Sequence, residues 1–207
     1  MYFDRMMISI IFISLLINVV RSAHFNGGTI TWTPVYPNSN SSSVLITVTQ
    51  SYSWVYPTET CTTNIPQSGS AASNNANLTC VASCATQGGY ATQTISIKTD
   101  CTSFSASLGI VFSERSVNIT LNVSTYFWIA YQGQAWRTLE NSVSNSWSIA
   151  SLIDLRRRPD GLINTPPISQ VASPQYVLVN TTTAINLLVS DVNTGDDLRC
   201  RWPLSNK

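Results

Sequence analysis

The stretch SVNITLNV, residues Ser116–Val123, decides the fold class, because apolar and polar residues alternate along it without a break. On an extended chain Asn118 and Asn122 fall on one side, and the Val, Ile and Leu residues around them fall on the other. A period of two is the pattern of a half-buried strand with one solvated face. The stretch therefore predicts a strand whose apolar side enters a core.

Similar runs recur along the chain and are separated by turn-forming residues such as Gly88-Gly89 and Asp160-Gly161. No segment after the first 22 residues carries apolar residues at helical spacing with caps over three turns. We therefore expect an all-β chain whose main domain is an antiparallel β-sandwich or jelly roll. The predicted strands are Thr29–Val35, Val44–Trp54, Thr94–Thr99, Leu108–Phe112, Ser116–Val123, Tyr126–Tyr131 and Trp147–Leu155.

Residues 1–22 read as a secretory signal peptide, because Asp4 and Arg5 precede an apolar run over Met6–Val20. The run is shorter than the roughly 20 apolar residues that span a bilayer. We place the cut after Ser22, with an uncleaved anchor as the rival interpretation. No membrane span is expected after cleavage, and the chain is expected to be secreted or held at the cell surface.

The mature chain is nearly uncharged, since 9 basic and 9 acidic residues remain without the leader. Only 10% of all residues are charged, against roughly 25% in average domains, so no nucleic-acid partner is indicated. Abundant Ser, Thr and Asn supply the polarity, together with five N-glycosylation sequons. These sequons begin at Asn40, Asn77, Asn118, Asn122 and Asn180.

Four cysteines, Cys61, Cys80, Cys84 and Cys101, lie within 41 residues, and Cys200 stands alone. In a secreted chain they indicate two disulfides with three possible connectivities, and Cys200 is expected to be unpaired in this chain. We favour Cys61 with Cys80 and Cys84 with Cys101. A bridge between residues four apart is disfavoured, because an extended chain separates them by roughly 13 Å.

A change in composition marks a domain boundary after residue 163. Residues 23–163 form the predicted sandwich, and residues 164–173, which contain Pro166-Pro167, form a predicted linker. Residues 174–207 carry only two further strand-like runs, Tyr176–Asn180 and Thr183–Val189. Two strands cannot bury a core of their own. We therefore expect residues 174–207 to be the incomplete start of a second module, with further modules beyond it.

The sequence contains no recognisable catalytic motif. His24 is the only histidine and lies at the mature N-terminus, so a catalytic triad lacks a base. Gly27-Gly28 and Gly88-Gly89 lack the spacing and the Lys of a phosphate-binding loop. No cofactor or metal is expected. The acids are scattered without a motif, at Glu59, Asp100, Glu114, Glu140 and Asp154.

Tyr52, Trp54 and Tyr56 share one face of a predicted strand. Exposed in a row, they would form a platform for sugar rings, whereas buried they are core residues, which is the commoner use of large aromatics. We favour the core interpretation and keep a carbohydrate-binding face as the alternative.

Two charged segments have an ordinary and a functional interpretation. Asp191–Asp197 offers oxygen ligands for calcium, but Asn, Thr, Gly and Asp are also standard turn formers, and we expect a solvated turn. Arg156–Arg158 precedes Pro159 and is short for a heparin-binding or protease-processing site. We expect it to be the solvated end of a strand.

Four segments carry a resemblance: HFNGGTITWTPV (His24–Val35), YFWIAYQGQAWRTL (Tyr126–Leu139), WSIASLIDLRRRPDGLINTPP (Trp147–Pro167) and SDVNTGDDLRCRW (Ser190–Trp202). Together they resemble the N-terminal region of large, mostly uncharacterised extracellular multidomain proteins of invertebrate animals. The resemblance implies a first β domain, followed by the start of a module similar to immunoglobulin, cadherin or PKD domains, in an extracellular or cell-surface protein. It supplies no catalytic residue and no ligand.

These observations predict a non-catalytic extracellular module for adhesion, matrix or surface recognition, whose partner is an extracellular protein or a glycan. Besides the aromatic carbohydrate-binding face, a hydrolase or a hydrolase accessory domain is a weaker alternative, and it requires two carboxylates in one pocket.

Secretion gives the first test. Expressed in animal cells, the full chain is expected in the medium, with a mass that falls on N-glycosidase treatment, because the leader directs export and the sequons accept glycans. Retention in the cytosol without a mass shift would contradict this prediction.

Overall fold

The computed structural model describes residues 25–67, 76–134, 136–137, 146–170, 177–193 and 195–201. The predicted signal peptide and His24 lie outside them. Within the described residues the chain is all-β with antiparallel sheets, as predicted, and its helical content is two single turns of 3₁₀ helix, η1 (Cys84–Thr86) and η2 (Tyr90–Thr92). The fold class predicted from the alternation is confirmed.

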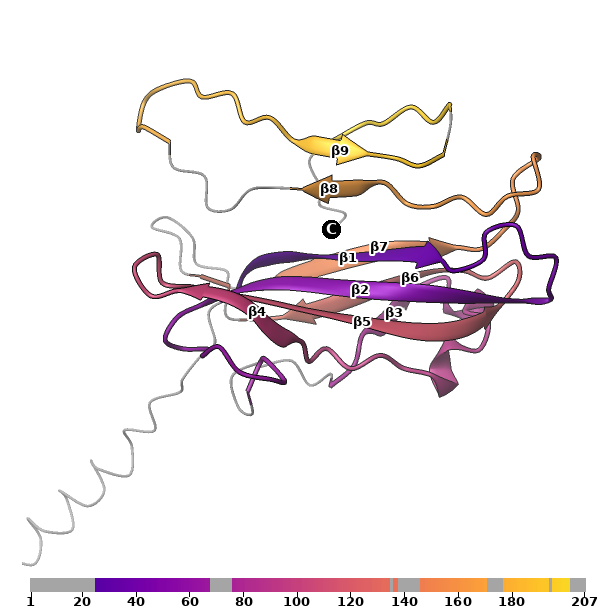
Figure 1. The fold of residues 1–207 in the computed structure, drawn as a ribbon, viewed down its shortest axis with the longest axis horizontal. Helices are drawn as coiled ribbons and strands as arrows, with labels where there is room; N and C mark the ends of the chain where they lie inside the picture. The colour runs from indigo at the N-terminus through magenta and orange to yellow at the C-terminus, as the bar shows by residue number, and fades with distance from the viewer. Residues whose placement is uncertain are drawn as a thin grey trace, which may run out of the picture.

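Two sheets form the sandwich, and a separate two-stranded ribbon lies beyond β1 and β7 (Figure 1). The four-stranded sheet has the order β1-β2-β5-β4, the three-stranded sheet has the order β3-β6-β7, and the ribbon pairs β8 with β9. The strands are β1 (Phe25–Pro34), β2 (Ser43–Val55), β3 (Thr79–Ala82), β4 (Asp100–Ser105), β5 (Ile110–Asn122), β6 (Tyr126–Gly133), β7 (Trp147–Asp154), β8 (Ile168–Gln170) and β9 (Leu188–Ser190).

Among the described strands, β2 and β5 form the longest pairing. It runs without a register shift from Ser43 opposite Asn122 to Val55 opposite Ile110. The runs Leu108–Phe112 and Ser116–Val123, predicted as two strands, therefore form the single strand β5, apart from their outermost residues. The polar residues between them continue the pleat, because a strand needs only alternation to bury one face.

The core lies between the two sheets and is rich in aromatic rings. Phe25 stacks on Trp147 with ring centroids 4.0 Å apart, and it meets Trp54 edge-on at 4.9 Å. Tyr131 of β6 packs against Tyr52 at 5.2 Å, so rings from both sheets join in one cluster. Such aromatic pairs add stabilisation to that of the buried area alone.

The edges of the two sheets meet at β1 and β7. Trp32 on β1 is 2% exposed, and its indole Nε1 donates to the main-chain oxygen of Leu152 on β7 at 2.7 Å. A main-chain acceptor at the edge of the three-stranded sheet is thereby satisfied from the other sheet, which helps to close the sandwich on this side.

The sequence patterns missed β3 and β4 and misjudged Thr94–Thr99. Ile95 and Ile97 in this segment are buried, as alternation predicts, yet the segment forms only isolated bridges, with Asn77 opposite Ser96. β4 is rich in Ser and Thr and interrupted by a bulge, so it has no apolar period to detect.

The disulfide connectivity corrects the favoured prediction. The bridges join Cys61 to Cys101 and Cys80 to Cys84, not Cys61 to Cys80 and Cys84 to Cys101. The prediction assumed an extended chain between Cys80 and Cys84. Instead Ser83 adopts a left-handed conformation (φ 57°) and η1 follows at once, so the chain doubles back and the two Cα atoms lie 5.8 Å apart.

The C-terminal segment also differs in detail. β8 lies inside the predicted linker 164–173, and of the run Thr183–Val189 only its last two residues join β9; the described part of Tyr176–Asn180 forms no strand. Many apolar side chains here are exposed, with Leu178 at 76% and Val179 at 87%. Cys200 is exposed and unpaired, as predicted.

The disulfides are expected to contribute unequally to stability. The Cys61–Cys101 bridge closes a loop with a sequence separation of 40, against 4 for Cys80–Cys84. Loop-closure entropy predicts a loss of about 4 kcal/mol of unfolding free energy for Cys61→Ser with Cys101→Ser, and about 2 kcal/mol for Cys80→Ser with Cys84→Ser. Urea unfolding followed by tryptophan fluorescence measures both. An equal or larger loss from the short loop would contradict the assignment.

Candidate functional site

The outer face of the four-stranded sheet is a regular array of short polar side chains. The register places Thr33, Thr47 and Asn118 in one row, and two further rows follow at intervals of about 7 Å. We call this array the hydroxyl face; its other rows are Thr31, Thr49 and Ser116, and Thr29, Ser51 and Glu114. All nine side chains are half-buried or exposed.

Hydrogen bonds across β2 and β5 hold these side chains in place. Thr47 Oγ1 donates to Asn118 Oδ1 at 2.8 Å, and Ser51 Oγ donates to Glu114 Oε2 at 2.5 Å. The hydroxyls of Thr49 and Ser116 lie 2.8 Å apart. Cross-strand pairs of this kind stabilise a sheet, and here they also fix the orientation of the polar groups.

One end of the hydroxyl face carries sequons. Asn118 and Asn122 are exposed on β5, and the Oδ1 contact of Asn118 leaves its Nδ2, the atom that carries an N-linked glycan, free of that bond. Asn40 is exposed in the connection from β1 to β2, at the same end. Elsewhere Asn180 is exposed and Asn77 is half-buried.

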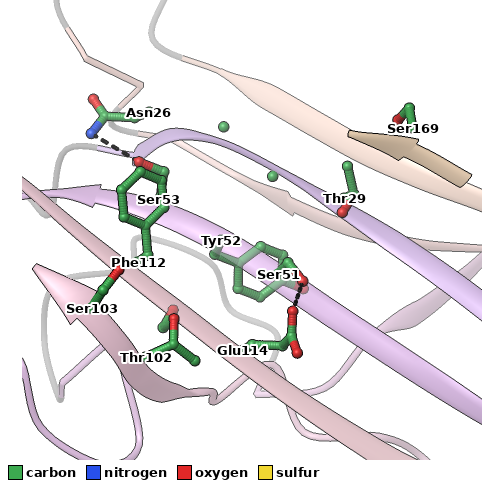
Figure 2. Close-up of a pocket in the computed structure, with 13 residues that line it drawn as sticks. Asn26, Thr29, Ser51, Tyr52, Ser53, Thr102, Ser103, Phe112, Glu114 and Ser169 are labelled. Carbon is green, nitrogen blue, oxygen red and sulfur yellow. Dashed lines mark hydrogen bonds between the residues drawn. The ribbon is translucent and has the colours of Figure 1, made fainter. Parts of the chain in front are cut away.

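The other end of the face holds a groove of about 610 Å³ (Figure 2). Phe112 contributes a half-buried ring, and Glu114 is the only charged side chain among the described lining residues. Ser169 of β8 borders the groove beside Thr29 of β1. The remaining side chains are short and mostly neutral and polar: Asn26, Ser51, Ser53, Thr102, Ser103 and Ser113, with Tyr52 beneath.

Gly27 and Gly28 leave the main chain of β1 bare in the groove. Gly27 has φ +138° beside the register shift that begins β1, a conformation that favours glycine. A Cβ on Gly28 would lie 2.4 Å from the main-chain oxygen of Ser51 and 2.6 Å from the Tyr52 ring. Gly28 thus permits the close contact between β1 and β2, and neither glycine places a side chain in the groove that both line.

A buried hydrogen-bond network supports the groove from below. Trp54 Nε1 donates to Ser113 Oγ at 3.0 Å, and Thr99 Oγ1 lies 2.7 Å from the same oxygen. Thr99 also bonds to the main-chain oxygen of Ile65 at 3.2 Å. The floor of the groove is therefore tied to the segment that carries the first disulfide.

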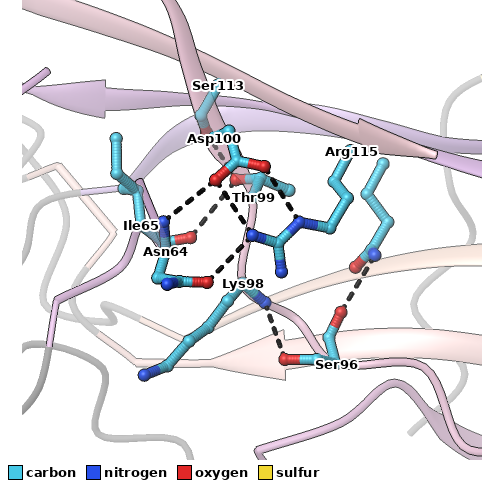
Figure 3. Close-up of polar contacts among 9 residues, drawn as sticks. Asn64, Ile65, Ser96, Lys98, Thr99, Asp100, Ser113 and Arg115 are labelled. Carbon is cyan, nitrogen blue, oxygen red and sulfur yellow. Dashed lines mark hydrogen bonds and ion pairs between the residues drawn. The ribbon is translucent and has the colours of Figure 1, made fainter. Parts of the chain in front are cut away.

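Arg115 braces the same segment from the side (Figure 3). Its guanidinium contacts Asp100 at 2.9 Å and 3.1 Å and Asn64 Oδ1 at 2.8 Å, while the main-chain N–H of Asn64 donates to Asp100. The hydrogen bonds from Arg115 hold the pKa of Asp100 below its usual value. With the Cys61–Cys101 bridge, these contacts fix the loop next to β4.

The strand face of Tyr52, Trp54 and Tyr56, kept as the alternative carbohydrate-binding surface, belongs mainly to the core. Tyr52 and Trp54 are 2% and 1% exposed, and Tyr56 lies just past the end of β2. Buried rings cannot stack on a ligand, so these three residues form no sugar platform, and the core interpretation holds for Tyr52 and Trp54.

The charged segments make specific internal contacts. Arg158 donates to both carboxylate oxygens of Asp196 at 2.9 and 3.0 Å, and Asn193 Oδ1 accepts from the main chain of Thr165. The oxygens proposed as calcium ligands thus bond to protein groups, which favours the turn interpretation. Arg156 pairs with Asp154. In the parts of the chain that the structure describes, no group of three His, Cys, Asp or Glu residues is placed to hold a metal ion.

The sequence patterns did not identify the groove. From the sequence, Gly27-Gly28 was interpreted only as lacking the spacing of a phosphate-binding loop, and Glu114 only as an acidic residue outside any motif. The signal available was the pair of glycines directly before the alternating TITWT of Thr29–Thr33, since a glycine inside a strand often marks a bulge or a close approach.

Comparison of the chain with protein-family models, with curated proteins and with solved structures finds no match. Among the described residues, no helix is long and apolar enough to cross a membrane. The fold and the site thus define the chain as an antiparallel β-sandwich with two disulfides and a polar groove on its outer face. The resemblance to invertebrate extracellular proteins stays a prediction.

Two buried tyrosines are expected to lower the stability of the folded chain at alkaline pH. Burial raises the pKa of Tyr52 well above 10.0 and that of Tyr90 to about 12. The unfolded chain ionises these phenols near pH 10 while the folded chain keeps them neutral, so the stabilisation is present below pH 10 and is lost above it. From pH 8 to pH 11 the ionisation of each phenol in the unfolded chain should lower the unfolding free energy, by about 1 kcal/mol for Tyr90.

Urea unfolding at the two pH values tests this pH dependence. In Tyr90→Phe the unfolding free energy should decrease less between the two pH values, because one buried phenol is gone. In Tyr36→Phe, which changes a side chain that is 66% exposed, the decrease should equal that of the unmodified protein. An unchanged pH dependence in Tyr90→Phe would contradict the prediction.

Proposed function

We propose that this chain is a non-catalytic extracellular recognition module, and that it binds its partner at the groove end of the hydroxyl face. The observation that carries the proposal is the division of this face. Three sequons lie at or beside one end, and a groove of about 610 Å³ lies at the other. Glycans at Asn118 and Asn122 would keep one end solvated and leave the groove end available for contact.

The chemistry of the groove supports recognition rather than catalysis. Glu114 is the one carboxylate among its described lining residues, whereas carboxylate-based hydrolysis needs two such groups within one site. Its other side chains are hydroxyls, an amide and aromatic rings, which bind and orient ligands. The hydrolase alternative therefore has no site in this groove to rest on.

Compartment and charge support the same proposal. Two disulfides are typical of proteins that fold in an oxidising environment. Their presence fits the leader and the sequons, and the near-neutral charge fits a surface that binds through shape and hydrogen bonds. Adhesion, matrix attachment and surface recognition are the roles that combine these properties.

A charge placed in the groove tests the proposal. Secreted, fluorescently labelled protein is expected to bind to intact animal cells or to a cell-derived matrix, measured by flow cytometry or by plate binding. Thr102→Arg, which adds a long charged side chain at an exposed position of the groove, should reduce binding at least about tenfold by blocking the site.

Ala85→Arg is the matched control, since it adds the same charge at an exposed position on η1. It should bind like the unmodified protein. Absence of binding by the folded protein, or an equal loss of binding in Thr102→Arg and Ala85→Arg, would contradict the proposal.

A further inference from the structure

We propose that the ligand of the groove is a neutral oligosaccharide, held by the Phe112 ring, the Glu114 carboxylate and the surrounding hydroxyls. This inference rests on the proposed function and names its ligand class. It places the site on the outer face of the sheet, where Phe112 supplies the accessible ring and the buried Tyr52 lies beneath.

The lining matches the two chemical sides of a sugar ring. A pyranose presents a patch of C–H groups on its faces and hydroxyls around its rim. The half-buried ring of Phe112 offers an apolar surface for the C–H patch, and short polar side chains surround it. Figure 2 shows these groups converging from β1, β2, β4 and β5, with Ser169 of β8 beyond them.

Glu114 has an oxygen available for a ligand. Its Oε2 accepts from Ser51 at 2.5 Å, which fixes the carboxylate, and the hydrogen bonds found at Glu114 leave Oε1 without a protein donor. A carboxylate accepts strong, charge-assisted hydrogen bonds from hydroxyl groups. The same negative charge repels sulfated and carboxylated glycans, and no basic side chain among the described lining residues offsets it.

A peptide fits the groove less well. Below the groove, β2 and β5 pair with strands on both sides, so a peptide lying across this face cannot add a strand to them. Phe112 is the only large apolar side chain that the outer face contributes to the lining, which leaves few apolar pockets for peptide side chains. The volume of about 610 Å³ is within the 300–1,000 Å³ typical of small-ligand sites.

Binding of defined oligosaccharides to the secreted protein tests the proposal. The probes are chitotetraose, mannotetraose and laminaritetraose, with a heparin tetrasaccharide as the acidic comparison, measured by isothermal calorimetry or on immobilised glycans. At least one neutral probe should bind and the heparin fragment should not. Binding of the heparin fragment alone, or of no probe, would overturn the proposal.

Three variants locate the binding. Glu114→Gln keeps the shape of the side chain and removes its charge, and Phe112→Leu keeps apolar bulk and removes the ring. Each should weaken binding about tenfold, while Ser116→Ala, on the hydroxyl face outside the groove, should leave it unchanged. Equal affinity in all the variants would place the sugar elsewhere and refute the proposal.

The outcomes also separate this inference from the proposed function. If Thr102→Arg abolishes cell binding but no neutral probe binds, the recognition module stands and the saccharide assignment falls. If a neutral probe binds in the groove but cells and matrix are not bound, the saccharide site stands and the extracellular recognition role falls. Competition of cell binding by the bound oligosaccharide would support both.

Discussion

The pairing of β2 with β5 is the constraint on which the rest of the structure depends. Thirteen residues of each strand pair in one unbroken register, and both strands alternate between core and solvent. A slip of one residue would move Ile46 and Val48 from the core to water and bring polar residues inward. The burial of the inner face therefore fixes the chemistry of the outer face, residue by residue.

That register connects stability with recognition. It aligns Ser51 with Glu114 and Thr47 with Asn118, so the same ladder orients the groove carboxylate and an exposed sequon. Glu114 and Asn118 are four residues apart on β5, which corresponds to about 13 Å. A glycan at one end and a ligand at the other can then occupy the same face without competing for the same side chains.

Local patterning was sufficient for part of this structure. The alternation at Ser116–Val123 predicted both the inward apolar set and the exposed Asn118 and Asn122. The disulfide pairing escaped prediction because it depends on the left-handed turn at Ser83, which no apolar period encodes. The groove escaped it because its groups come from four strands and β8, and only the folded sheet brings Gly28, Phe112 and Ser169 together.

The register of β2 against β5 is open to direct measurement by NMR on isotopically labelled protein. The structure predicts cross-strand nuclear Overhauser contacts that join Thr49 to Ser116 and Thr47 to Asn118 as directly opposed pairs. These contacts would confirm that the sequons and the groove share one outer face. Contacts that instead oppose Thr49 to Val117 would shift the register by one residue, place the two sets of side chains on different faces, and contradict the account.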